Sequence, residues 1–293
     1  MTTTNTRTDT MINTDSQIKI NPAAEPRTAT QASLYQQLRG HLATLKLTTA
    51  AEQLPLVLDQ ATADGLSLTA ALEQLLRAEV DATEARRLAG RLRFACLPTP
   101  ASLDDFDYDA TPHLDRHLIN ELSTCRYLES ATNVLLIGPP GVGKTHLAVG
   151  LGRAAAEAGY RTYFTTAADL AARCHRAAIE GRWATTMRFF AGPTLLVIDE
   201  LGYLPLPGEA ASALFQVVSQ RYLKTSIVIT SNRGVGAWGD ILGDTTVAAA
   251  LLDRLLHRSV VINLDGDSYR LRHHHAAADQ LRQTTTGTRQ PLR

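Results

Sequence analysis

Residues 134–145 read VLLIGPPGVGKT, and no other stretch of the chain indicates its fold as strongly. From Gly138 to Thr145 it fits the pattern G-x-x-x-x-G-K-[S/T], whose glycines let a loop wrap around a polyphosphate. An apolar run, Val134–Ile137, precedes the loop and a helical run, Thr145–Ala158, follows it. A chance match is the alternative, and the presence of both flanks argues against it. The stretch therefore predicts a phosphate-binding loop between a strand and a helix.

Four further apolar runs follow the loop and alternate with helix-length connections. They are Arg161–Thr165, Leu195–Ile198, Ile227–Thr230 and Ser259–Leu264. Short strands rich in Val, Ile and Leu at such intervals are typical of a parallel sheet with helices on both faces. We therefore expect an α/β fold of the P-loop NTPase type, with a last helix at Val247–Leu256.

The loop supplies the residues expected to contact ATP. These are Gly138, Pro139, Pro140, Gly141, Val142, Gly143, Lys144 and Thr145, together with the neighbouring His146. In such loops the lysine, here Lys144, reaches the outer phosphates, and the hydroxyl of Thr145 ligates Mg²⁺.

Two adjacent carboxylates, Asp199 and Glu200, end the apolar run Leu195–Ile198. Open parallel sheets bind ligands at the carboxyl ends of their strands. We expect Asp199 to hold Mg²⁺ together with Thr145, and Glu200 to polarise the attacking water, because the two tasks need separate carboxylates. The alternative is a strand that ends in a solvated acidic turn.

Asn232 follows the run Ile227–Thr230 at the same predicted edge of the sheet. An asparagine at a strand end is most often a turn former. After a phosphate loop and an acidic strand end, we instead expect its amide to contact both the γ-phosphate and the water. Asn232 is then a sensor of the bound nucleotide.

Composition excludes several classes of protein. The 293 residues carry 29 basic and 29 acidic side chains, which excludes a polybasic nucleic-acid coat but not local basic patches. The three cysteines form no CxxC pair, which argues against a disulfide framework or a structural zinc site. With no apolar leader and no run of about 18 apolar residues, we expect a cytoplasmic protein that does not contact a membrane.

Composition also predicts four segments. Residues 1–32 and 284–293 are poor in large apolar side chains, and we expect both to be disordered tails. In residues 33–96, leucines recur at helical spacing, as at Leu34, Leu38, Leu42 and Leu45, and then at Leu68, Leu72, Leu75, Leu76 and Val80. This segment is expected to be a small helical domain that docks a partner or DNA. Residues 97–283 are expected to be the ATPase domain.

Further stretches of the sequence are more specific to one family than the phosphate loop is. They include DELGYLP at 199–205, SQRY at 219–222, TSNR at 230–233, LDRLLH at 252–257 and GDSYRLR at 266–272. With these, residues 33–282 resemble the IstB-like ATP-binding helper proteins of bacterial insertion sequences, relatives of the DnaC-type helicase loaders. The resemblance implies an AAA+ fold and an ATPase that assembles as a homo-oligomer, in a ring or a helical filament.

The resemblance also implies roles for two arginines. Arg254 is the candidate arginine finger that enters the ATP site of the adjacent subunit, and Arg270 is the candidate second sensor that contacts the γ-phosphate. A guanidinium suits either role because it neutralises charge on the γ-phosphoryl oxygens. Swapped roles, or Arg258 as the finger, stay open, and the short sequence after Arg272 argues against a full helical lid.

By the same resemblance, the protein binds double-stranded DNA with little sequence preference and stimulates a transposase encoded by the same element. The sequence itself offers Arg173, Arg176 and Arg182 as DNA contacts, since they lie between the second strand and the acidic strand end. The alternative is an ordinary solvated helix face. A second basic cluster comprises Arg86, Arg87, Arg91 and Arg93.

Three other functions compete with the transposition helper. A DnaC-type helicase loader shares the same ATP site, and only the DELGYLP run argues against it. A nucleotide-gated scaffold that hardly turns over conflicts with the presence of Glu200. A small-molecule kinase is the weakest alternative, because no acceptor-substrate pocket is visible in the sequence.

Overall fold

The computed structural model describes residues 31–203, 208–266 and 268–269. They form two compact units, which divide within helix α3 between Ala82 and Thr83. The sequence predicts a boundary at residues 96–97, just before Pro98 and Pro100. Instead α3 (Leu68–Ala95) belongs to both units and ends only before Cys96, which has a left-handed φ of 52°.

The first unit is helical. It contains α1 (Gln31–Thr44), α2 (Thr48–Asp64) and the first part of α3. Gly65 ends α2 in the left-handed conformation, and the Ser67 hydroxyl caps α3 by accepting a hydrogen bond from the Ala70 N–H at 3.2 Å. Glycine just after a helix and serine just before the next are typical of these two positions.

The core of this unit is small and contains few of the leucines that mark the sequence. Leu42 of α1 and Leu75 of α3 are buried with Ala50, Ala51 and Leu54 of α2. The other leucines of the expected stripes are mostly exposed, among them Leu34, Leu38, Leu45, Leu68, Leu72 and Leu76. The helical spacing thus predicted the helices, but only part of each stripe faces the core.

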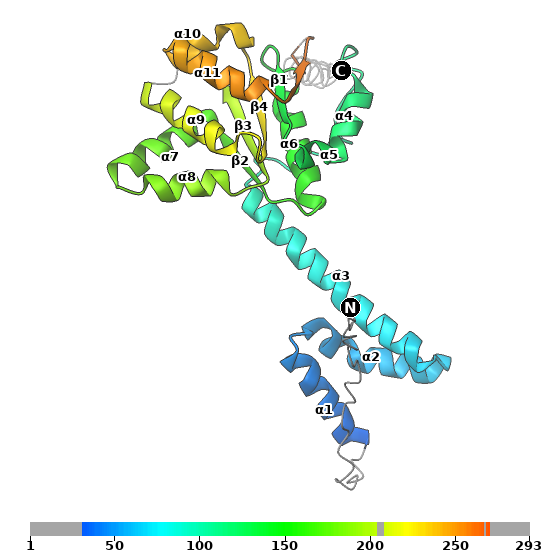
Figure 1. Cartoon of the computed structure of the whole chain (residues 1–293). Helices are drawn as coiled ribbons and strands as arrows, with labels where there is room; N and C mark the ends of the chain where they lie inside the picture. The colour runs from blue at the N-terminus through cyan, green and yellow to red at the C-terminus, as the bar shows by residue number, and fades with distance from the viewer. Residues whose placement is uncertain (1–30, 204–207, 267, 270–293) are drawn as a thin grey trace, which may run out of the picture. The chain divides into compact units, whose positions relative to one another are not determined.

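The second unit is built around a parallel sheet of five strands in the order β2-β3-β4-β1-β5 (Figure 1). The strands are β1 (Asn133–Ile137), β2 (Thr162–Thr166), β3 (Leu195–Leu201), β4 (Ser226–Ser231) and β5 (Ser259–Asn263). All five predicted strands are present and every pairing is parallel, so the α/β fold class is confirmed.

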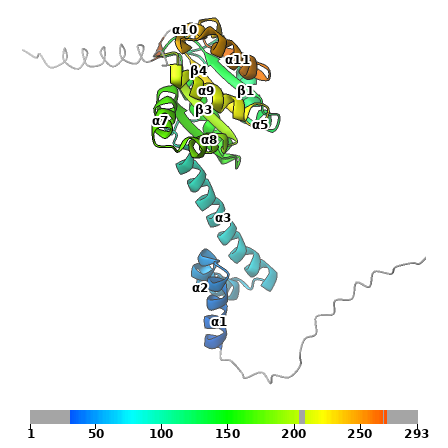
Figure 2. The ribbon, with the colours of Figure 1, turned by 60° about the vertical axis from the view of Figure 1, so that its left-hand side comes forward.

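Helices cover both faces of this sheet, and Figure 2 looks onto one of the two helical layers. One face packs against α4 (Arg116–Ser123), α5 (Arg126–Glu129) and α6 (Lys144–Glu157). The other packs against α7 (Ala167–Ile179), α8 (Trp183–Ala191), α9 (Gly208–Arg221), α10 (Trp238–Leu242) and α11 (Thr245–Leu256), and a short 3-10 turn, Val235–Ala237, precedes α10.

The strand sequences explain why there are two cores. Side chains alternate between the faces of a strand. In β1, Leu135 and Ile137 therefore enter the core under α7–α11, whereas Val134 and Leu136 enter the core under α6. Such strands must be apolar on both faces, which is why they read as continuous apolar runs.

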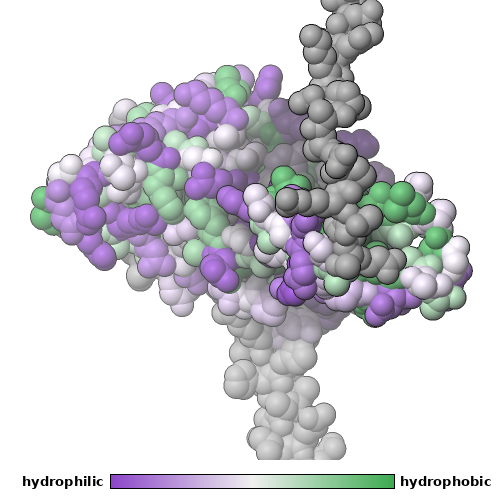
Figure 3. Space-filling view, turned by 90° about the horizontal axis from the view of Figure 1, so that it is seen from below, coloured by the Kyte–Doolittle hydropathy of each residue, from purple (hydrophilic) through white to green (hydrophobic). Residues whose placement is uncertain are grey.

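No helix among the described residues is long and apolar enough to cross a membrane. The face drawn in Figure 3 interleaves hydrophilic residues, in purple, with apolar ones, in green.

Candidate functional site

The phosphate-binding loop joins β1 to the N-terminus of α6, as its sequence predicted. Gly141 and Gly143 have left-handed φ angles of 86° and 94°, which a side chain would strain. The loop is also packed closely, because a Cβ at Gly138 would lie 2.1 Å from the backbone oxygen of Leu264. Its backbone N–H groups lie at the start of a 14-residue helix, where the helix dipole favours bound phosphate.

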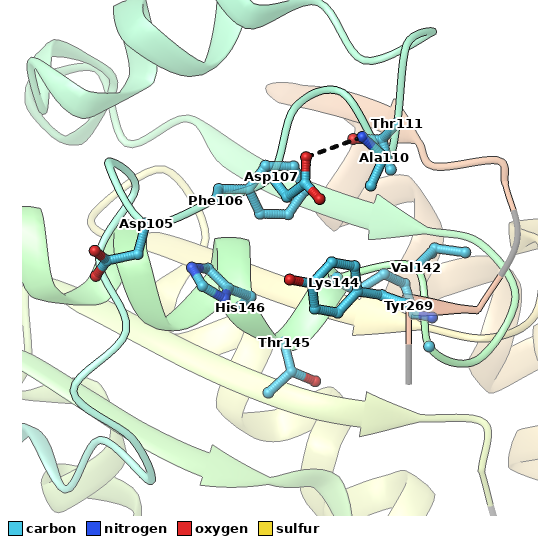
Figure 4. A pocket seen from close by; sticks show the side chains of 12 residues that line it. Asp105, Phe106, Asp107, Ala110, Thr111, Val142, Lys144, Thr145, His146 and Tyr269 are labelled. Atoms are coloured by element: carbon cyan, nitrogen blue, oxygen red, sulfur yellow. Dashed lines mark hydrogen bonds between the residues drawn. The ribbon is translucent and has the colours of Figure 1, made fainter. Parts of the chain in front are cut away.

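The loop forms one wall of a cavity of about 240 Å³ (Figure 4). Two segments distant in sequence complete the wall: residues 105–111, before α4, and Tyr269, whose N–H donates to the backbone oxygen of Gly141 at 3.0 Å. The lining residues are Asp105, Phe106, Asp107, Ala110, Thr111, Gly141, Val142, Gly143, Lys144, Thr145, His146 and Tyr269.

Phe106, in the segment before α4, packs against both the phosphate-binding loop and His146. Its ring lies edge-on to that of His146, with 5.5 Å between centroids, and a Cβ at Gly143 would come within 2.6 Å of it. His146 is held in turn by a 2.8 Å hydrogen bond between Nε2 and the backbone oxygen of Ser102. Hydrogen bonds from Ser102 to Asp105 lower the pKa of that carboxyl, which keeps a negative charge at the rim.

Sequence reasoning missed Phe106, Thr111 and Tyr269 as site residues. Their only local signals were an aromatic pair, Phe106 and Tyr108, inside an acidic stretch, and the conspicuous sequence around Tyr269. Neither signal identifies a pocket wall, because the wall forms only when the segment before α4 and the segment after β5 pack against the loop.

The structure brings together the two predicted magnesium ligands. The Thr145 hydroxyl lies 3.1 Å and 3.0 Å from the two carboxylate oxygens of Asp199, which is 4% exposed at the end of β3. A hydroxyl and a carboxylate oxygen are the hard donors that Mg²⁺ prefers, so these residues fit that ion. Lys144 is buried at the start of α6 and donates to the backbone oxygen of Pro139 at 2.6 Å.

Glu200 differs from Asp199 in both exposure and backbone. Its side chain is exposed, and its φ of 63° is left-handed. Its N–H donates to the Thr230 hydroxyl at 2.9 Å, and that hydroxyl donates to Asp199 Oδ1. Thr230 was not among the residues predicted for the site.

Asn232 follows β4 and lies against the turn after β3, since a Cβ at Gly202 would be 3.2 Å from Asn232 Oδ1. That oxygen is buried and has no hydrogen-bond partner among the described residues. The sensor role of Asn232 stays a prediction.

The candidate finger does not line the cavity of its own chain. Arg254 lies on α11, donates to the backbone oxygen of Ala250 at 2.9 Å and stacks 4.6 Å from the ring centroid of Phe215. Arg258 is exposed and donates to the backbone oxygen of Ser130 at 3.1 Å. Arg270 lies outside the described residues, as do the two expected tails apart from the first residues of α1.

The three candidate DNA contacts line one hollow between α7 and α8. Arg173 stacks 3.8 Å from the ring centroid of Phe189 and donates to the Tyr163 hydroxyl at 3.2 Å. Arg182 is ion-paired with Glu180, which offsets part of its charge, and Arg176 is exposed. In the second basic cluster, Arg91 donates to the backbone oxygen of Ala156 on α6 at 2.7 Å and so has a structural contact.

Comparison with known proteins supplies a family. Residues 40–277 match the model of the family described as "IstB-like ATP binding protein". The chain is 43% identical to an insertion sequence IS5376 ATP-binding protein of Geobacillus stearothermophilus, over 78% of this chain and 91% of the relative. It is 38% identical to an insertion sequence IS21 ATP-binding protein of Pseudomonas aeruginosa, over 83% and 92%.

Among solved structures, the chain resembles AMPPCP-bound DnaA from Aquifex aeolicus, with a TM-score of 0.51 and 21% identity. The match covers 68% of this chain and 58% of DnaA. At this identity the likeness concerns the fold alone, and it agrees with the AAA+ fold expected from the sequence.

Proposed function

The chain belongs to the family of IstB-like ATP-binding proteins, and from this premise we propose that it hydrolyses ATP in a Mg²⁺-dependent reaction. The observation that carries the proposal is the Thr145–Asp199 contact beside the phosphate-binding loop, with Glu200 next in the chain. This combination supplies phosphate binding, metal ligands and a separate carboxylate for water.

Each residue of the site has a distinct task. Backbone N–H groups of the loop and the Lys144 ammonium bind the β- and γ-phosphates. Mg²⁺, when bound by Thr145 and Asp199, neutralises charge on those phosphates. Glu200 accepts a proton from the water whose oxygen bonds to the γ-phosphorus, while the bond from that phosphorus to the β–γ bridging oxygen breaks, leaving ADP and phosphate.

We further propose that the protein works as a homo-oligomer on double-stranded DNA and stimulates a transposase of the same element. The relatives are named as insertion-sequence ATP-binding proteins, which favours this partner over the helicase of a DnaC-type loader. The homo-oligomer is proposed from the family resemblance, in which Arg254 is the candidate finger; in this structure Arg254 lies on α11 and does not line the cavity of its own chain. The hollow with Arg173, Arg176 and Arg182 is the proposed DNA contact.

The first test measures ATP turnover with and without double-stranded DNA, while light scattering follows oligomer size. We expect DNA to raise turnover and ATP to drive assembly. Stimulation only by single-stranded DNA or a helicase favours the loader instead. Absence of turnover under all these conditions contradicts the ATPase proposal.

Two variants test the assignment of the site. Glu200→Gln is expected to bind ATP but to lose turnover by roughly 10²- to 10⁴-fold, because it can no longer accept the proton. It should therefore persist on DNA as an ATP-bound oligomer. Lys144→Ala is expected to lose nucleotide binding, and unchanged ATP affinity in that variant contradicts the phosphate-loop assignment.

The finger is tested by mixing subunits. Arg254→Ala is expected to bind ATP without hydrolysing it, and to recover turnover when mixed with Lys144→Ala, which still offers its own Arg254. Arg258→Ala is the matched comparison from the same region of the chain. Rescue of Arg258→Ala but not of Arg254→Ala assigns the finger to Arg258.

The DNA contact is tested by salt dependence. Removing a phosphate contact reduces the slope of log affinity against log salt by roughly 0.9. We expect Arg176→Ala to do so, whereas Arg126→Ala, which removes an exposed arginine at the start of α5, is the control that leaves the slope unchanged. An unchanged slope in Arg176→Ala contradicts the proposal that this hollow of the protein contacts DNA.

A further inference from the structure

The ladder between β3 and β4 is irregular at the acidic strand end. Ile198 pairs with Ile229, and pairing resumes only at Leu201 with Ser231. Asp199 and Glu200 therefore face a single residue of β4, Thr230. Two residues opposite one define a β-bulge, a feature that is common next to active sites because it re-aims a side chain.

The bulge matters because consecutive residues of a regular strand point to opposite faces. On a regular strand, Asp199 and Glu200 would therefore point to opposite faces of the sheet. With the bulge, Asp199 stays buried against Thr145, while the chain turns at Glu200 into the left-handed conformation and exposes that side chain.

Thr230 holds both residues of the bulge with one hydroxyl. The extra residue of a bulge loses its partner in the ladder. Here the Thr230 Oγ1 replaces that partner by accepting from the Glu200 N–H at 2.9 Å, and its proton is donated to Asp199 Oδ1. Thr230 is 1% exposed, so water does not compete for these bonds. A left-handed φ at a non-glycine residue persists only where its surroundings enforce it.

We propose that Thr230 is a positioning residue of the ATPase site: its hydroxyl orients the Asp199 carboxylate toward the metal and holds the Glu200 backbone so that its carboxylate faces the water. This inference rests on the proposed ATP hydrolysis. In this assignment the buried Thr230 acts only through the two acidic residues that it hydrogen-bonds. Its removal is therefore expected to affect metal dependence and the chemical step more than ATP binding.

The test compares Thr230→Val, which keeps the shape but lacks the hydroxyl, with Thr230→Ser, which keeps the hydroxyl. Thr162→Val is the matched control, because Thr162 is fully buried in β2 and its hydroxyl has no hydrogen-bond partner among the described residues. Thr230→Ala is a second hydroxyl-free variant, so the test does not depend on how valine packs. For each variant we measure ATP affinity, kcat and the Mg²⁺ concentration at half-maximal turnover.

We expect Thr230→Val and Thr230→Ala to lower kcat by roughly 10- to 100-fold, the scale of a misplaced catalytic group, and to raise the half-saturating Mg²⁺ concentration severalfold. ATP affinity measured without Mg²⁺ should stay within about twofold, since phosphate binding is left to the loop. Thr230→Ser and Thr162→Val should match the parent protein in all three quantities.

Two results overturn the inference. Parent-like kcat and Mg²⁺ dependence in a hydroxyl-free variant show that the hydroxyl is not needed. Equal damage in Thr230→Ser shows that the methyl group, and so packing, is responsible. Both are distinct from failure of the proposed function, in which the parent protein itself does not turn over ATP.

Discussion

Arg221 is the last residue of α9 and one of the largest fully buried side chains of the second unit, at 1% exposure. Its guanidinium donates to four backbone oxygens, those of Phe190 at 2.7 Å, Pro193 at 3.0 Å, Thr194 at 3.3 Å and Ser226 at 2.8 Å. Burial lowers its pKa to about 9, so it still carries its charge at neutral pH. One side chain thus joins the end of α8, the turn before β3 and the start of β4.

Arg221→Met is therefore expected to destabilise the second unit strongly. Hydrogen bonds from a charged donor contribute at least about 1.5 kcal/mol each, so the four together contribute about 6 kcal/mol. Methionine also removes the buried Nε–H, which has no partner among the described residues and costs about 2 kcal/mol. The difference is about 4 kcal/mol, or about 12 °C in Tm for a unit of this size.

The assay is urea unfolding followed by tryptophan fluorescence. Both tryptophans of the chain, Trp183 and Trp238, lie in the second unit, so the signal reports that unit alone. Arg126→Met is the control, because the Arg126 side chain is 76% exposed and its ion pair with Glu121 is expected to contribute less than about 1 kcal/mol. If Arg221→Met lowers the free energy of unfolding by less than about 1 kcal/mol, the prediction is wrong. The four hydrogen bonds then contribute hardly more than the desolvation of the guanidinium costs.

Two further predictions concern the loop and the cysteines. Gly143→Ala places a Cβ 2.6 Å from the Phe106 ring at a φ of 94°, and we expect nucleotide affinity to fall by roughly tenfold or more in a titration with a fluorescent ATP analogue; unchanged affinity would mean that the loop and Phe106 adjust freely. Of the three cysteines, only exposed Cys96 is expected to react quickly with a thiol reagent at pH 8, because Cys125 and Cys174 are buried and burial raises the pKa of Cys174 to about 11. Three fast equivalents in the native protein would contradict the packing of the second unit, and three in denaturant are the internal standard.

The sequence predicts the two units to different extents. In the second unit, strands such as Val134–Ile137 were predictable because both faces are buried, so their composition is apolar throughout. In the first unit, the leucine spacing predicted helices but not burial. Leu72 and Leu75 belong to one predicted stripe, yet Leu75 is 4% exposed and Leu72 is 50% exposed. A stripe on a helix is wider than the contact that one neighbouring helix can cover.

The positions of the phosphate loop and of the two carboxylates at the end of β3 could be predicted from the sequence. A loop that wraps a phosphate between a strand and a helix needs its glycines, lysine and threonine at fixed local spacing, so the requirement is written in one contiguous stretch. The two predicted magnesium ligands, Thr145 and Asp199, are far apart in sequence. Their contact was still predictable, because the carboxyl ends of parallel strands lie at one edge of the sheet, where the phosphate loop also lies.

The tertiary structure decided which distant residues complete the site. Phe106 precedes β1 in the chain and Tyr269 follows β5, yet both line the cavity. No local sequence pattern predicts that these two residues lie at one site. The bulge opposite Thr230 depends on the register between β3 and β4, which is a property of two strands and not of either sequence by itself. A site made of neighbouring residues, such as the phosphate loop, can be predicted from the sequence. The register between two strands and the closure of a cavity depend on how the whole unit packs.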